Sequence, residues 1–125
     1  MVECNGVEKF CMTEPKTVSY GRRISDLAAA HPDKVAIVFV SHPSGREQAL
    51  TWSELDRRSN QSARVLADLG VATESTIVIG LPNGEHHIVA AIAAWKVGAM
   101  VLPLYPRMPE SERSRILKLA NPTVI

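Results

Sequence analysis

The sequence predicts an α/β fold with a parallel sheet, on two observations. Between residues 76 and 125, short apolar runs of strand length alternate with longer segments whose apolar residues recur at helical spacing. Such alternation is typical of strand–helix–strand units with right-handed crossovers, which place their strands in one parallel sheet. Before residue 70, two helical patterns flank two β-rich runs, which predicts an N-terminal helix and a β-hairpin ahead of that sheet.

The first expected element is a short packing helix over residues 22–30. Ile24, Leu27 and Ala28 recur there at helical spacing. The pattern ends before Pro32, because the residue that precedes a proline avoids the α region.

A β-hairpin should follow this helix. Residues 35–40 and residues 49–52 are rich in β-branched and aromatic side chains. The polar stretch between them contains Pro43, Ser44 and Gly45, which are turn-forming residues. The two runs are therefore expected to pair as antiparallel strands.

The second helix has the clearest signal in the chain. Thr51 and Glu54 have the spacing of a capping box, in which each side chain satisfies a free backbone N–H at the helix start. Gly70 supplies the left-handed residue that commonly ends a helix. The buried stripe should consist of Leu55, Ser59, Ser62, Leu66 and Leu69, and the outward side chains mostly of Arg57, Arg58, Arg64 and Asp68.

The parallel sheet should begin with residues 76–81, a run that is apolar on both faces, as central parallel strands are. The helix expected over residues 85–97 is almost uncharged after its first turn, so it should be buried nearly all round, with Gly98 as its cap. The remaining elements are a strand at 100–102, a proline-punctuated connection at 103–109, a helix at 110–119 and the start of a third strand at 123–125. Because that strand stops as it begins and leaves an apolar edge open, we expect the C-terminus to be a break in a larger fold.

Composition argues against several partners and locations. A net charge of +1, from 14 basic and 13 acidic residues, gives no field for nucleic acid or an anionic membrane. Cys4 and Cys11 form neither a C-x-x-C pair nor a disulfide framework, so a reducing, cytoplasmic location is expected. Charges interrupt the first twenty positions, so no secretory signal is predicted. The apolar run Ile88–Tyr105 is split by Gly98 and Pro103, so no transmembrane segment is predicted either.

Five stretches of the sequence carry a resemblance to a known family. They are L-T-W-S-E-L-D-R-R-S-N (Leu50 to Asn60), A-D-L-G-V (Ala67 to Val71), I-V-I-G-L-P-N-G-E (Ile77 to Glu85), A-A-W-K-V-G-A (Ala93 to Ala99) and P-L-Y-P-R-M-P (Pro103 to Pro109). In this order and at these spacings they resemble the N-terminal region of the adenylate-forming superfamily. That superfamily includes acyl- and aryl-CoA ligases, luciferases and the adenylation domains of peptide synthetases.

Within the superfamily, the chain is most similar to bacterial acyl- and acid–CoA ligases. Adenylation domains of peptide synthetases usually carry an aspartate where this chain has Tyr105, whereas Trp95-Lys96 and Arg107-Met108-Pro109 are similar to the ligases. The resemblance implies that the complete enzyme uses ATP and magnesium to convert a carboxylic acid, such as a fatty acid, into an acyl-adenylate with release of pyrophosphate. It would then pass the acyl group to the thiol of CoA.

The sequence also predicts a domain organisation. Residues 1–18 show no periodic pattern and mix Pro15 with scattered charges, so they should form a loose leader. The resemblance implies that residues 19–125 form part of the N-terminal subdomain of such a ligase, truncated at its C-terminus. The expected partner is therefore the remaining part of the ligase, together with the carboxylic acid substrate in the complete enzyme.

Acyl-adenylate formation needs a phosphate-binding loop, a metal partner, a ribose-binding acid and a lysine that neutralises the developing charge. The Ser41–Arg46 cluster lies between two strands and favours a hairpin turn over a phosphate loop, and the sequence has no G-x-x-x-x-G-K-[ST]. The family resemblance places the catalytic groups beyond the end of this chain. We therefore expect no catalytic, cofactor-binding or metal-binding residue in it, no ATP, magnesium or CoA bound to it, and no activity from it alone.

Four local features compete with that expectation, but each has a structural explanation. His86 and His87 are adjacent on a helix, whereas metal-binding pairs on helices sit at i and i+4. Asn83-Gly84 resembles an anion-binding turn but fits a helix cap equally well. Trp95 could line an acyl pocket, although an aromatic on a buried helical stripe is more often core. Arg107 could meet a phosphate of CoA, although a solvated loop arginine is the commoner case.

Three other hypotheses stay open. The chain could be a truncated, non-catalytic remnant or protein-interaction fragment, a piece of a peptide-synthetase adenylation domain, or a self-sufficient α/β binding module. The last predicts that the chain alone unfolds cooperatively. In the coding sequence after Ile125, an in-frame Ser/Thr/Gly-rich loop ending in lysine would favour the ligase, whereas a stop or frameshift would favour the remnant.

Overall fold

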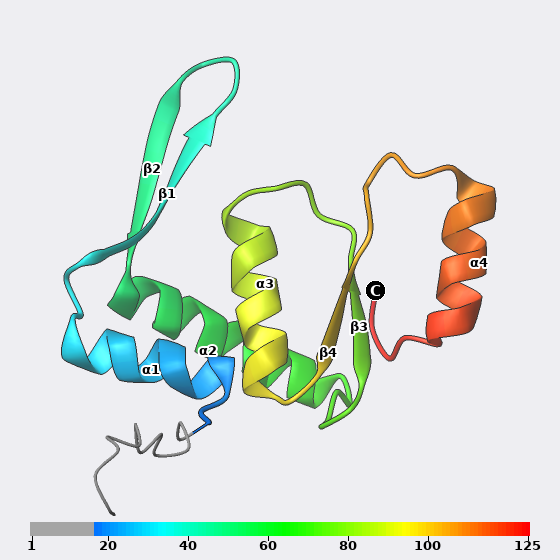
Figure 1. Cartoon of the computed structure of the whole chain (residues 1–125), viewed down its shortest axis with the longest axis horizontal. Coiled ribbons are helices and arrows are strands. Elements are labelled where there is room, and N and C mark those ends of the chain that lie inside the picture. Colours follow the sequence, from blue (N-terminus) through cyan, green and yellow to red (C-terminus); the bar gives the residue numbers. More distant parts are fainter. Residues whose placement is uncertain (1–16) are drawn as a thin grey trace, which may run out of the picture.

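The computed structural model describes residues 17–125, in which helices and strands alternate as an α/β fold. The predicted class is therefore confirmed. Figure 1 shows a hairpin that projects from a group of three helices, a short sheet beside them and a fourth helix at the far side of that sheet. In chain order the elements are α1 (Tyr20–Ala30), β1 (Val35–Ser41), β2 (Arg46–Thr51), α2 (Trp52–Asp68), β3 (Thr76–Ile79), α3 (Glu85–Lys96), β4 (Met100–Pro103) and α4 (Glu110–Ala120).

The hairpin of β1 and β2 is antiparallel, as predicted, but its second strand is longer than expected at one end and shorter at the other. Strand β2 begins at Arg46, where the turn ends with Gly45 in the left-handed region at φ 65°. Trp52, predicted in the strand, instead begins α2. The reason is the capping box, which fixes the helix start directly after Thr51.

That capping box has both of its hydrogen bonds. The Thr51 hydroxyl accepts from the backbone N–H of Glu54 at 3.2 Å. In return, the Glu54 carboxylate accepts from the backbone N–H of Thr51 at 2.9 Å, and these bonds to Thr51 lower the pKa of Glu54. The capping box fixes the point where the strand ends and the helix begins. The side chains of Thr51 and Glu54 accept hydrogen bonds from backbone N–H groups that have no partner within the strand or the helix.

Replacing Thr51 by alanine should lower the free energy of unfolding by about 1 kcal/mol, because two helix-start N–H groups lose or weaken their bonds. Urea unfolding followed by circular dichroism measures this change. The matched control is Thr17→Ala, the same substitution at an exposed position outside every helix. Equal stability of the two variants would contradict the role given to the cap.

The second sheet is parallel, and the structure adds the strand neighbours that the sequence left open. Strand β3 pairs with β4 from Thr76↔Met100 to Ile79↔Pro103. On its other edge, Ile77 forms a parallel bridge with Val124. The predicted third strand is thus present as a short segment beside β3, which places β3 in the middle.

Two apolar clusters that share α3 form the core. The first, between the hairpin, α2 and α3, contains Leu50, Leu55, Val89 and Ile92. The second, between α2, α3 and the sheet, contains Val71, Ile77, Ala94 and Ala99. Because five of its residues are buried, α3 is enclosed on most sides, as predicted. The hairpin depends on the first cluster, since a two-stranded ribbon alone is marginally stable in water.

Two side chains expected in the core are not there. Trp95 is 39% exposed, because it lies near the end of α3 and stacks on Tyr20 of α1 with ring centroids 5.2 Å apart. Leu69 is 58% exposed, because it caps α2 and lies beyond the stripe that faces the core.

The apolar run Ile88–Tyr105 divides into α3 and β4, as expected from Gly98 and Pro103. Between residues 17 and 125, no helix has both the length and the apolar character needed to cross a membrane. Helix α4 contains no buried residue, so it adds little to the core.

Candidate functional site

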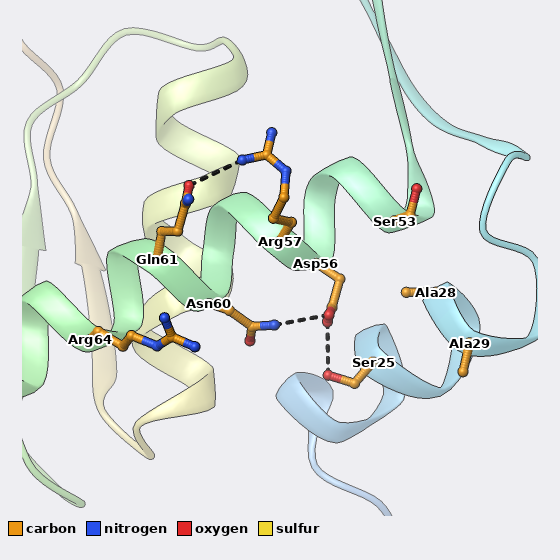
Figure 2. Close-up of a pocket in the computed structure, with 9 residues that line it drawn as sticks. All are labelled: Ser25, Ala28, Ala29, Ser53, Asp56, Arg57, Asn60, Gln61 and Arg64. Atoms are coloured by element: carbon orange, nitrogen blue, oxygen red, sulfur yellow. Dashed lines mark hydrogen bonds between the residues drawn. The ribbon is translucent and has the colours of Figure 1, made fainter.

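A polar cavity of about 470 Å³ lies between α1 and α2. Figure 2 shows Ser25 of α1 and Asp56 and Asn60 of α2 pointing toward one another at its edge. Asp56 and Asn60 share one face of α2 because they are four residues apart. The cavity is therefore built where two helices present polar side chains to each other.

Lys96, the last residue of α3, completes this cluster of polar side chains. Its Nζ lies 2.6 Å from Asp56 Oδ1 and 2.7 Å from Asn60 Oδ1, and 3.4 Å from the backbone oxygen of Asp56. An ammonium group has three donors, so all three have an acceptor. The Lys96 side chain is only 9% exposed, which makes this a largely buried ion pair.

The carboxylate of Asp56 is equally well satisfied. It accepts from Ser25 Oγ at 2.8 Å and from Asn60 Nδ2 at 2.9 Å in addition to Lys96. Burial alone would raise the pKa of Asp56, but the hydrogen bonds from Lys96, Ser25 and Asn60 and the charge of Lys96 outweigh it and lower the pKa. Within residues 17–125, no buried side-chain polar atom lacks a partner.

A close approach of α1 to α3 makes this geometry possible. Gly21 faces the end of α3, and a Cβ placed on it would lie 2.9 Å from Lys96 Cα. Glycine is therefore required for α1 to bring Ser25 within reach of Asp56. The cluster Ser25, Asp56, Asn60 and Lys96, here called the helix-junction cluster, holds α1, α2 and α3 together.

The helix-junction cluster gives stability a pH dependence. Because the folded state lowers the pKa of Asp56, the unfolded chain takes up a proton first as pH falls, and stability is lost below the ordinary value of 3.8. The stability difference between the unmodified chain and Asp56→Asn should be constant above about pH 6 and shrink toward about pH 3. Urea unfolding across this range measures it. A difference that does not change with pH would contradict the pairing of Asp56.

The helix-junction cluster stabilises the fold and does not offer a free acid or base for catalysis. Its acid and its base are already bonded to each other, so neither is free to act on a substrate. The sequence interpretation missed the cluster, although a signal was present: Lys96 is the only charge in an apolar run, and a buried lysine needs a carboxylate partner. What the sequence did not show was which carboxylate.

The histidines considered as metal ligands do not converge on a site. His86 is exposed, and His87 Nδ1 lies 3.2 Å from the backbone oxygen of Leu81. In the described part of the chain, no three histidine, cysteine or acidic side chains gather at a spacing that would hold a metal ion. Cys4 and Cys11 of the predicted leader lie outside the described residues.

A smaller cavity of about 380 Å³ lies at the carboxyl ends of the parallel strands. Asn83 and His87 line it after β3, and Tyr105 and Arg107 line it after β4. Asn83 does not cap α3 with its side chain, because the N-cap is Gly84 and makes no side-chain bond. Ligands of open α/β sheets bind at this end of the strands, so the position is of functional interest.

Comparison with known proteins gives a family match over most of the chain. The family model described as "AMP-binding enzyme" matches residues 24–125. A dimodular nonribosomal peptide synthase of Bacillus subtilis (strain 168) is 35% identical over 98 residues, which are 78% of this chain and 4% of that protein. The chondramide synthase cmdD of Chondromyces crocatus is 36% identical over 125 residues, which are 100% of this chain and 3% of that protein.

Solved structures share the fold. The N-terminal subdomain of Klebsiella oxytoca NpsA, in complex with anthranilyl-AMSN, superposes with a TM-score of 0.73 and 20% identity, covering 83% of this chain and 26% of that one. A Mycobacterium tuberculosis fatty acyl CoA synthetase gives a TM-score of 0.73 and 24% identity, covering 83% of this chain and 20% of that one. The chain thus spans a small part of the peptide synthases and about a quarter of the NpsA subdomain.

Proposed function

The chain belongs to the AMP-binding enzyme family, and from that premise we propose that it is the N-terminal part of an enzyme that joins a carboxylic acid to ATP as an acyl-adenylate. The match over residues 24–125 carries the proposal, and the fold that the chain shares with the N-terminal subdomain of NpsA is consistent with it. We also propose that the enzyme works in the cytosol, where ATP is supplied.

The contribution of this chain to the reaction is structural. In the polar cavity between α1 and α2, Asp56 is already bonded to Lys96, Ser25 and Asn60, so this carboxylate is not free to hold a magnesium ion or to meet the triphosphate of ATP. What the chain supplies is a rigid junction of three helices and the first strands of a parallel sheet. The carboxyl ends of those strands are where a substrate-binding region of the complete enzyme would begin.

For the second step we propose transfer of the acyl group to CoA. Tyr105 and Arg107 support this choice, because they follow β4 at the carboxyl end of the sheet and Arg107 is exposed beside the smaller cavity. The guanidinium of Arg107 forms no ion pair with any described acidic side chain, so it could bind a phosphate of CoA. Transfer to a carrier protein is the second candidate, since the relatives at 35% and 36% identity are peptide synthases.

Assaying transfer to CoA and to a carrier protein in the enzyme extended beyond Ile125 separates the two acceptors, and Arg107→Ala tests the proposed contact with CoA. If CoA is the acceptor, this change should raise the KM for CoA about tenfold, the effect of losing one charged hydrogen bond, and leave adenylate formation unchanged. Arg113→Ala, at an exposed position of α4, is the matched control. Transfer only to a carrier protein would contradict the CoA proposal, and an unchanged KM for CoA would contradict the role given to Arg107.

The acyl-adenylate itself can be trapped. The protein extended by whatever its reading frame encodes after Ile125 is incubated with ATP, magnesium, hydroxylamine and a panel of carboxylic acids. We expect a hydroxamate from at least one acid, because hydroxylamine attacks an activated acyl group. A folded extended protein that gives none across the panel would contradict adenylation, and a stop codon directly after Ile125 would favour a non-catalytic remnant.

A further inference from the structure

Asn83 and Gly84 lie in the loop that joins β3 to α3 (Figure 1). Asn83 is exposed, and neither its side-chain amide nor the backbone N–H of Gly84 has a hydrogen-bond partner among the residues that the structure describes. A Cβ placed on Gly84 would have no atom within 4 Å, so the space beside its backbone nitrogen is open. A free side-chain amide therefore precedes a free and unshielded backbone nitrogen.

This arrangement allows a reaction within the chain. The backbone nitrogen of Gly84 attacks the side-chain carbonyl carbon of Asn83, and the bond between that carbon and Nδ2 breaks. The proton lost by the attacking nitrogen leaves with the amide group as ammonia, and a five-membered succinimide ring remains. Water then opens the ring at one of its two carbonyl carbons. Opening at the side-chain carbonyl gives aspartate, and opening at the main-chain carbonyl gives isoaspartate.

We propose that Asn83 is a site of spontaneous deamidation in the folded protein, with aspartate and isoaspartate as its products. The other two asparagines that the structure describes each lack a requirement of the reaction. Asn121 precedes a proline, whose nitrogen has no proton to lose. Asn60 lies inside α2, where its amide group donates to Asp56 at 2.9 Å and accepts from Lys96 at 2.7 Å.

The modification would change the charge of a cavity. Asn83 lines the cavity of about 380 Å³ at the carboxyl ends of the parallel strands, together with His87 and Arg107. Deamidation replaces a neutral amide there with a carboxylate. Because Asn83 directly precedes the start of α3, whose free N–H groups favour negative charge, the fold should tolerate the aspartate product. The reaction thus adds an anion to the cavity that contains Arg107, and it requires neither a substrate nor further residues of the enzyme.

Peptide mapping by mass spectrometry tests the proposal. The 125-residue chain is incubated in mildly alkaline buffer, and the conversion of each asparagine is followed in digested samples. Asn83 should convert at least about tenfold faster than Asn60, because Asn60 first has to give up hydrogen bonds to two charged groups. Gly84→Ala should slow the conversion of Asn83, because the added methyl group shields the nitrogen. Gly80→Ala, where a Cβ also has no atom within 4 Å, is the matched control and should leave the rate unchanged.

Two results would overturn the inference. One is conversion of Asn83 that is no faster than that of Asn60, in samples where Asn5-Gly6, the same dipeptide outside the described residues, does convert. The other is formation of aspartate without isoaspartate at Asn83, because direct hydrolysis of the amide, without a ring, gives aspartate alone. Circular dichroism of the incubated samples checks that the chain stays folded, so that the rates belong to the folded protein.

Discussion

Replacing Lys96 by methionine should lower the free energy of unfolding by about 3 kcal/mol. Methionine keeps most of the apolar stem, so the loss reports on the ammonium group. Its removal leaves Asp56, whose side chain is 20% exposed, without the cation that it contacts at 2.6 Å. A largely buried carboxylate without its partner is costly, whereas the intact pair is nearly neutral compared with an apolar replacement. Urea unfolding of the unmodified chain and the variant measures the difference.

Two comparisons show whether the ion pair is the cause. Lys118→Met makes the same substitution at an exposed position of α4 and should change stability by no more than about 0.5 kcal/mol. The double variant Asp56→Asn, Lys96→Met should be destabilised by less than the sum of the two single variants, because Asp56 and Lys96 bind each other and either single variant already breaks their ion pair. If Lys96→Met and Lys118→Met were equally stable, the helix-junction cluster would not stabilise the fold.

Replacing Gly21 by alanine should lower the free energy of unfolding by about 2 kcal/mol. Alanine favours a helix over glycine by about 1 kcal/mol, so helix propensity alone predicts the opposite sign. The added Cβ, however, would lie 2.9 Å from Lys96 Cα and 3.1 Å from its backbone nitrogen. Because those are backbone atoms, α1 has to move away from α3, which also lengthens the contact between Ser25 and Asp56.

Gly80→Ala is the matched control, since no atom lies within 4 Å of a Cβ placed there. It should be neutral or slightly stabilising, by up to about 0.5 kcal/mol. Thermal unfolding followed by circular dichroism distinguishes the two glycine variants. A Gly21→Ala variant that is as stable as Gly80→Ala would show that the close approach of α1 and α3 is not needed.

Local signals in the sequence predicted most of the fold. The capping box at Thr51 and Glu54 depends on residues three apart, and the alternation after residue 76 depends on short periods. Such signals are read within a few positions, so the class and the order of elements could be predicted. The family could also be identified, because its five stretches occur in a fixed order.

Features that depend on distant residues could not be predicted. Asp56 and Lys96 are 40 positions apart, and only the packing of α1, α2 and α3 brings them together. The position of Val124 beside Ile77 and the exposure of Trp95 likewise depend on how whole elements pack.

Acid-dependent exchange between ATP and pyrophosphate separates a structural role of this chain from a catalytic one. We propose that the chain provides structure for an adenylate-forming enzyme whose chemistry requires further residues. The extended protein should catalyse the exchange with one or more carboxylic acids, and the 125-residue chain alone should give none. Exchange by the 125-residue chain would contradict the structural role, and no exchange by a folded extended protein, with any acid, would contradict adenylate formation.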